Sequence, residues 1–115
     1  MELLDKKLAI EQAGNNPILA KELFTMLLNE LPSLRDKLNT AVDHDSSTEM
    51  WEHAHKIYGS TAYCGVPALK QAAKAFEDCL REEEYEQIPF LLNNLNQEVE
   101  RLLSEGAFLL DEDWS

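Results

Sequence analysis

Two stretches of this chain space their core-facing residues identically, and this spacing strongly constrains the fold. The steps between successive residues are four, three and four in both stretches, which are Met50, Ala54, Ile57 and Thr61, and Leu69, Ala73, Phe76 and Leu80. Such steps follow one face of a helix with 3.6 residues per turn. No segment shows the strict alternation of apolar and polar residues, bounded by turn signals, that a half-buried strand would need. The sequence therefore predicts an all-α fold.

Capping residues mark where the first two long helices begin. Asn16 has the form of an N-cap, and Pro17 follows it at the first helical position. Ser46 followed three residues later by Glu49 has the form of a capping box. Pro32 lies inside the first helix, but the apolar spacing keeps its phase across it, which favours a kink over a break.

Two further helices follow, and together the four helices predict a bundle. Pro67 and Pro89 open the third and fourth helices, the run 81–84 is a solvated helix end, and Gly106 is expected to end the fourth helix. Amphipathic helices with short connections favour an up-and-down antiparallel four-helix bundle, here with a short extra N-terminal helix. We expect one domain over residues 1–115, comprising an N-terminal helical segment (1–13), the bundle (16–106) and a tail (107–115).

The charge and the cysteines narrow the class of protein. A net charge of −12 repels phosphate backbones and anionic lipids, so we expect neither nucleic-acid binding nor direct membrane contact. No apolar stretch approaches the roughly 20 residues of a membrane span, and the first residues do not read as a secretory signal. Cys64 and Cys79 form no CxxC motif and are expected to be free, buried thiols. These features favour a cytoplasmic location.

The three histidines are the candidates for chemistry. His44 falls in an acidic turn, where we expect it to be solvated. His53 precedes His55 by two residues, about 200° around a helix, so the two cannot share a face. Glu52 and His55 have the spacing used by di-iron bundles, but such a site needs two of these motifs, so we expect no metal site. His55 borders the core face, where a structural and a chemical role are both open.

Gly59 favours a chemical role for His55. A glycine inside a helix costs about 1 kcal/mol relative to alanine, and Gly59 is one turn from His55 on the same face. Ser60 and Ala62 keep the neighbouring turn small. Either Gly59 leaves the imidazole unshielded, or it permits close packing of two helices. An unshielded neutral imidazole can act as a nucleophile near pH 7.

The residues around His55 resemble a known family. The segment Ala54-His55-Lys56-Ile57-Tyr58-Gly59-Ser60, followed by Gly65, Leu69 and Phe76-Glu77, is similar to the core motif of histidine-containing phosphotransfer (HPt) domains. Residues 26–38 and 63–67 resemble in particular the C-terminal HPt module of hybrid sensor kinases of the BarA/GacS type. The resemblance covers roughly residues 3–105, and residues 107–115 have no counterpart in it.

This resemblance implies a function in a bacterial two-component phosphorelay. His55 would be the phosphoacceptor, taking a phosphoryl group from the aspartate of one receiver domain and passing it to the aspartate of a response regulator. The implied partners are these receiver domains, the isolated domain would be a monomer, and a parent kinase would be anchored in the inner membrane. This domain would bind no cofactor, because the Mg²⁺ would belong to the receiver. No phosphate-cradling loop exists, so no autonomous kinase activity is expected.

The resemblance also implies a supporting set around His55, namely Gly59, Lys56, Tyr58, Ser60 and Glu77. Many family members carry lysine three residues after the histidine, where this chain has Tyr58. Lys56, Lys70 and Lys74 are candidates to supply that positive charge instead.

Glu77 has two interpretations that the sequence leaves open. It corresponds to a position where family members have Gln or Glu facing the histidine, so it would accept a hydrogen bond from Nδ1–H of His55. Alternatively, it is a surface residue that pairs with Arg81 one helical turn later.

A different class of function also competes. The chain would then be a non-catalytic acidic helical-bundle adaptor that docks receiver domains or other partners. The sequence identifies neither the cognate receivers nor the signal, and it does not show whether the chain is free-standing or part of a larger kinase.

Overall fold

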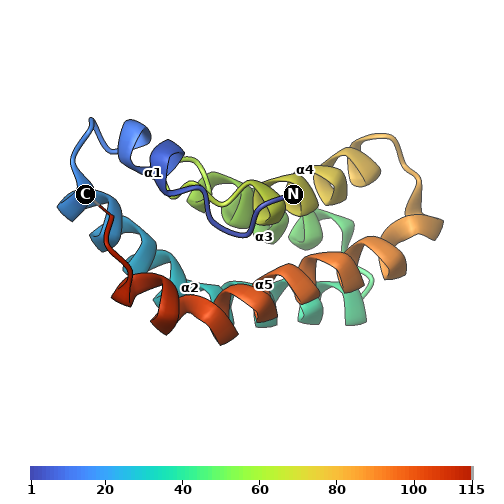
Figure 1. Cartoon of the computed structure of the whole chain (residues 1–115). Coiled ribbons are helices and arrows are strands. Elements are labelled where there is room, and N and C mark those ends of the chain that lie inside the picture. Colours follow the sequence, from blue (N-terminus) through green and yellow to red (C-terminus); the bar gives the residue numbers. More distant parts are fainter. Residues whose placement is uncertain (115) are drawn as a thin grey trace.

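Five α-helices form the described part of the chain, residues 1–114, in a computed structural model (Figure 1). They are α1 (Lys6–Gln12), α2 (Pro17–Asp43), α3 (Ser47–Ser60), α4 (Pro67–Arg81) and α5 (Ile88–Asp111), with a short 3₁₀ turn at Tyr85–Gln87. Helix α3 packs against α2, α4 against α3 and α5 against α4, and α5 also packs against α2. The predicted all-α up-and-down four-helix bundle with a short extra N-terminal helix is confirmed.

The predicted helix starts are confirmed at both caps. The Asn16 side chain accepts a hydrogen bond from a backbone N–H three residues on, at 3.1 Å. The Ser46 hydroxyl accepts one from the Glu49 N–H at 3.4 Å, while the Ser46 N–H donates to the Ala41 carbonyl. Helix α2 is continuous through Pro32, so the break considered above does not occur.

The two predicted core faces are both buried. All their members lie in the core, namely Met50, Ala54, Ile57 and Thr61 from α3 and Leu69, Ala73, Phe76 and Leu80 from α4. They pack against apolar side chains of the longer helices, among them Leu31, Leu38, Leu95 and Leu102. Burial of these faces against one another fixes the rotation of α3 and α4 about their axes.

Helices α2 and α5 are much longer than α3 and α4, so other parts of the chain must pack against the ends that α3 and α4 do not reach. Helices α2 and α5 have 27 and 24 residues, whereas α3 and α4 have 14 and 15. Figure 1 shows α1 lying over the part of α2 that α3 and α4 do not reach. The Trp114 indole packs there against Phe24, with ring centroids 5.7 Å apart, and its Nε1–H donates to the Leu109 carbonyl at 2.8 Å.

The prediction that Gly106 ends the fourth helix is wrong. Helix α5 continues to Asp111, so residues 107–111 of the predicted tail are helical. Gly106 is buried, and a Cβ atom there would lie 2.6 Å from Cδ1 of Leu28 on α2. The glycine lets α5 approach α2 closely, which is a packing role rather than a terminating one.

The N-terminal segment is tied to the connection between α3 and α4. The Asp5 N–H donates to the Gly65 carbonyl at 2.8 Å, and the Ala68 N–H donates to the Glu2 carbonyl at 3.3 Å. Gly65 has φ +63°, and a Cβ atom there would lie 2.5 Å from the Asp5 carbonyl oxygen. Both the left-handed backbone and this close approach require glycine.

Among residues 1–114, no helix is both long and apolar enough to cross a membrane. Cys64 and Cys79 are free thiols, and both are buried. Burial raises the pKa of the Cys64 thiol from its ordinary 9.0 to about 11.

This raised pKa predicts slow alkylation of Cys64 in the native domain. At pH 8 the thiolate fraction falls about 100-fold for a pKa increase of this size, so iodoacetamide should modify Cys64 about 100-fold more slowly than in the urea-unfolded chain. The rate should increase as the pH rises from 8 to 10. Peptide mass spectrometry measures the alkylation of Cys64 over time. Equal alkylation rates in native and unfolded protein would contradict the buried position of this thiol.

The indole of Trp114 is expected to stabilise the domain. Trp114→Ala should lower the free energy of unfolding by about 3 kcal/mol, because it removes a buried ring and leaves Phe24 uncovered. Phe108→Ala is the matched control, since that ring is 76% exposed and its removal should change stability little. Urea denaturation of both variants measures their free energies of unfolding. Equal denaturation midpoints for the two variants would contradict a stabilising role for Trp114.

Candidate functional site

Helices α3 and α4 face each other along one edge with two different kinds of side chain. Helix α3 contributes rings at steps of four and three, and α4 contributes charged groups at steps of four, three and four. We call this set the α3–α4 edge: Trp51, His55 and Tyr58 from α3, and Lys70, Lys74, Glu77 and Arg81 from α4. Both spacings follow one face of a helix, so the members of each row lie in line.

His55 and Glu77 meet in the middle of this edge. The His55 Nδ1 lies 2.9 Å from the Glu77 Oε1, and the side chains are 61% and 6% exposed respectively. An ionised carboxylate only accepts hydrogen bonds, and a buried one requires a donor. The arrangement therefore holds the proton of a neutral imidazole on Nδ1 and leaves the Nε2 lone pair free.

This geometry decides between the two interpretations of Glu77. The predicted hydrogen bond with His55 is formed, which confirms that Glu77 faces the histidine. The predicted alternative partner, Arg81, instead donates to Asp78 Oδ1 at 2.9 Å.

Trp51 and Arg81 lie beside His55 in a way that the sequence analysis did not predict. The Trp51 and His55 rings are stacked, with centroids 5.4 Å apart and planes 13° from parallel. The Arg81 guanidinium carbon lies 5.6 Å from the centroid of the Trp51 ring. The available signal was spacing, because Trp51 precedes His55 by four residues and Arg81 follows Glu77 by four.

Two candidate lysines lie on the α4 side of the edge. The Lys70 Nζ is 5.9 Å from the centroid of the Tyr58 ring, and the Lys74 Nζ is 2.9 Å from Asp78 Oδ2. The hydrogen bond to Asp78 raises the pKa of Lys74, and the same bond lowers the pKa of Asp78. Positive charge is thus held beside Tyr58, the position where the resemblance led us to look for a lysine.

Lys56 and Ser60 lie apart from the α4 lysines. They line a groove between α2 and α3, together with Glu30 and Lys37. The Ser60 hydroxyl donates to the Lys56 carbonyl at 2.9 Å, a bond within α3 itself. Of the predicted supporting residues, the structure thus brings Tyr58 and Glu77 together with the α4 lysines and places Lys56 and Ser60 toward α2.

Gly59 is exposed, and its surroundings are open. A Cβ atom built at this position would meet no heavy atom within 4 Å. Of the two explanations for Gly59, close packing of helices is therefore wrong. The open space lies one turn beyond His55, on the side away from Trp51.

The other two histidines lie outside this arrangement. His44 is exposed at the C-terminal cap of α2, as predicted. His53 is half-buried, and its Nδ1 is buried without a hydrogen-bond partner. Residues 1–114 contain no cluster of three or more His, Cys, Asp or Glu side chains that would hold a metal ion.

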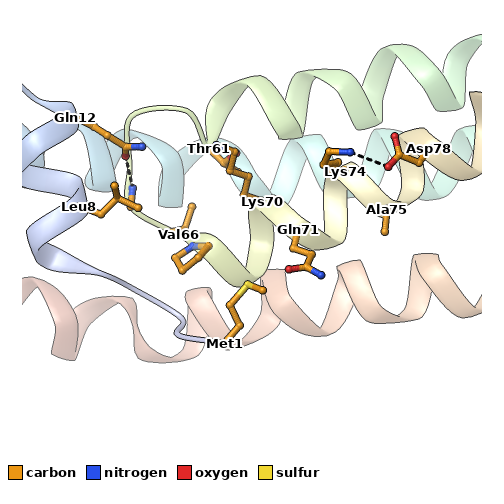
Figure 2. A pocket seen from close by; sticks show the side chains of 12 residues that line it. Met1, Leu8, Gln12, Thr61, Val66, Lys70, Gln71, Lys74, Ala75 and Asp78 are labelled. Atoms are coloured by element: carbon orange, nitrogen blue, oxygen red, sulfur yellow. Dashed lines mark hydrogen bonds and ion pairs between the residues drawn. The ribbon is translucent and has the colours of Figure 1, made fainter.

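A groove of about 540 Å³ adjoins the edge near Lys70 and Lys74 (Figure 2). Its apolar lining comes from the N-terminal segment and from the start of α4, and includes Met1, Leu8, Val66 and Pro67. Figure 2 shows the Lys74–Asp78 ion pair toward one end of the groove and the Gln12 side chain at the other. The Gln12 Oε1 accepts a hydrogen bond from the Gly65 N–H at 3.1 Å, which helps to hold the N-terminal segment against the connection to α4.

The chain is similar in sequence to known proteins of one family. The Hpt domain family matches residues 22–105. The histidine-protein kinase BarA of Escherichia coli is 33% identical over 111 residues, and the sensor histidine kinase GacS of Pseudomonas protegens is 29% identical over 106 residues. These matches cover 93% and 92% of this chain but only 12% of each kinase.

A solved structure is also similar. The crystal structure of the HPT domain from a sensor hybrid histidine kinase of Shewanella has a TM-score of 0.69 and is 31% identical. The match covers 90% of this chain and 95% of that domain. The likeness therefore extends over nearly the whole of a known HPT domain.

The open surroundings of Gly59 predict that it can be replaced without loss of fold. Gly59→Ala should raise the free energy of unfolding by up to about 1 kcal/mol, and Gly59→Leu should remain folded. Gly65→Ala is the contrasting variant, because its backbone is strained for alanine and its Cβ would meet a backbone oxygen, so it should lose more than about 1 kcal/mol. Thermal unfolding of the three variants tests this order, and destabilisation by Gly59→Ala would refute it.

Proposed function

Because this chain belongs to the Hpt domain family, the histidine phosphotransfer modules of two-component phosphorelays, we propose that His55 is the residue on which it carries the phosphoryl group. One observation supports this choice among the three histidines. His55 has an exposed ring whose Nδ1 is hydrogen-bonded to the buried carboxylate of Glu77. His44 is a solvated cap residue, and His53 lies on another side of α3.

The proposed reaction moves one phosphoryl group between two proteins. The Nε2 lone pair of His55 attacks the phosphorus of an aspartyl phosphate on a receiver domain, the bond from phosphorus to the aspartate oxygen breaks, and the aspartate leaves as a carboxylate. The proton on Nδ1 remains in place, so the phosphorylated ring is positively charged. Glu77 balances this charge through its hydrogen bond. The reverse step passes the phosphoryl group to the aspartate of the next receiver.

The proposed partners follow from the family. HPt domains of hybrid kinases interact with receiver and response-regulator domains, and we extend this to the present chain. Mg²⁺ would be held by the receiver, where it neutralises the charge of the transferring group. A monomeric state, a cytoplasmic location and the absence of nucleic-acid binding remain predictions, as does a membrane-anchored parent kinase.

A non-catalytic adaptor explains the site less well. A surface that only docks partners has no need for a carboxylate buried beneath a histidine. Nor does it need a helix-interior glycine that packs against nothing. Phosphotransfer gives both residues a role.

The proposal predicts that His55→Gln abolishes phosphate uptake and leaves the melting temperature nearly unchanged. The glutamine amide can still donate to Glu77, and the His55 ring is mostly exposed, so little packing is lost. Incubation with a phosphorylated receiver should give the wild type an acid-labile, base-stable phosphate. His53→Gln and His44→Gln are the controls and should accept phosphate normally. Phosphate on His53 would contradict the assignment to His55. Labelling of the purified domain by ATP alone would contradict the separate prediction that it has no autonomous kinase activity.

A further inference from the structure

The exposed ring of His55 needs more than one contact to hold its direction. Its hydrogen bond to Glu77 restrains the distance from Nδ1 to the carboxylate oxygen, but coupled rotations about the Cα–Cβ and Cβ–Cγ bonds can still tilt the ring while that distance is kept. With 61% of the side chain exposed, packing restrains this rotation weakly. Free rotation would move Nε2 away from the line of attack, and phosphoryl transfer depends strongly on alignment.

Trp51 supplies the missing restraint. Its ring is stacked against one face of the imidazole in an offset arrangement, with centroids 5.4 Å apart and the two planes 13° from parallel. A flat surface against one face opposes rotation out of that plane. The hydrogen bond and the stack therefore act on different motions of the same ring.

The orientation of Trp51 is itself held from α4. The Arg81 guanidinium lies over the Trp51 ring at 5.6 Å, and Arg81 also donates to Asp78, which accepts from Lys74. Trp51 is half-buried and packs against the core on its inner side. The indole is thus placed between the core and a tethered cation.

We propose that Trp51 is a positioning residue for phosphotransfer, which aims Nε2 of His55 and stabilises the positively charged ring of the phosphorylated state. This proposal rests on the proposed function. The face of an indole attracts a cation, and the phosphorylated imidazole keeps its Nδ1 proton and so carries a positive charge next to that face. The stack is therefore expected to strengthen when the phosphoryl group is bound.

The arrangement also determines from which side a receiver can reach Nε2 of His55. Trp51 stacks against the imidazole from the preceding turn of α3, whereas the following turn is open at Gly59. A receiver that reaches Nε2 therefore approaches over Gly59. A bulky side chain at position 59 would obstruct this approach, and Trp51 does not.

The test replaces the flat ring while keeping an apolar side chain. Trp51→Leu should lower the transfer rate at saturating phosphorylated receiver by about tenfold, because alignment is lost, and should leave the affinity for the receiver within twofold. Trp51→Phe retains a flat face and should recover most of the rate. In both wild type and Trp51→Phe, nuclear magnetic resonance should show the His55 ring protons displaced by the neighbouring aromatic ring, and this displacement should vanish in Trp51→Leu.

Controls separate the possible failures. Phe90→Leu removes an exposed aromatic ring from α5 and should change neither the rate nor the His55 resonances. If Trp51→Leu does not fold, Trp51→Met replaces it, because its flexible chain fills the space without a flat face. A folded variant that lacks the resonance displacement but transfers at the wild-type rate overturns the positioning role, as does a loss confined to receiver affinity. If the wild type itself takes up no phosphate on His55, the proposed function fails instead.

Discussion

A carboxylate buried between two helices determines how the rest of the site is built. Glu77 lies on α4 with 6% of its side chain exposed, and its Oε1 is bonded to Nδ1 of His55 on α3. Removing the donor would leave a buried carboxylate without its hydrogen-bond partner, which costs about 1–3 kcal/mol or more. The register between α3 and α4 must therefore keep this bond, and the identical apolar spacing of the two helices allows it to do so.

Charge on the α3–α4 edge differs from that of the whole chain. The chain carries −12, yet α4 places Lys70, Lys74 and Arg81 along the row that contains Glu77. Aromatic rings of α3 lie beneath two of these cations, and Asp78 holds the third. This row partly offsets, next to His55, the repulsion that an acidic domain exerts on a phosphoryl group.

Local patterns predicted most of the fold, because helix period and capping depend on nearby residues. The core faces of α3 and α4 and the caps at Asn16 and Ser46 were found this way, whereas the hydrogen bond between His55 and Glu77 was implied only by the family resemblance and stood beside a pairing with Arg81. The extension of α5 and the burial of Trp114 were not predicted, since they depend on which helices remain uncovered after the bundle forms. The spacing of four residues between Trp51 and His55 could have predicted their stack. The contact of Arg81 with Trp51 could not be predicted in this way, because Arg81 lies on the facing helix α4.

Three of the glycines in this chain are present for three different physical reasons, which the residue type alone does not reveal. Gly65 has a left-handed backbone against the Asp5 carbonyl, and Gly106 makes room for Leu28, so each is explained by the fold. Gly59 has neither a positive φ nor a neighbour within 4 Å, yet it reduces the stability of α3 by about 1 kcal/mol relative to alanine. Since packing offers no compensation for that loss, the remaining explanation is what approaches from outside. Under the proposed function, the open turn beside His55 serves the receiver that approaches Nε2 rather than the packing of the bundle.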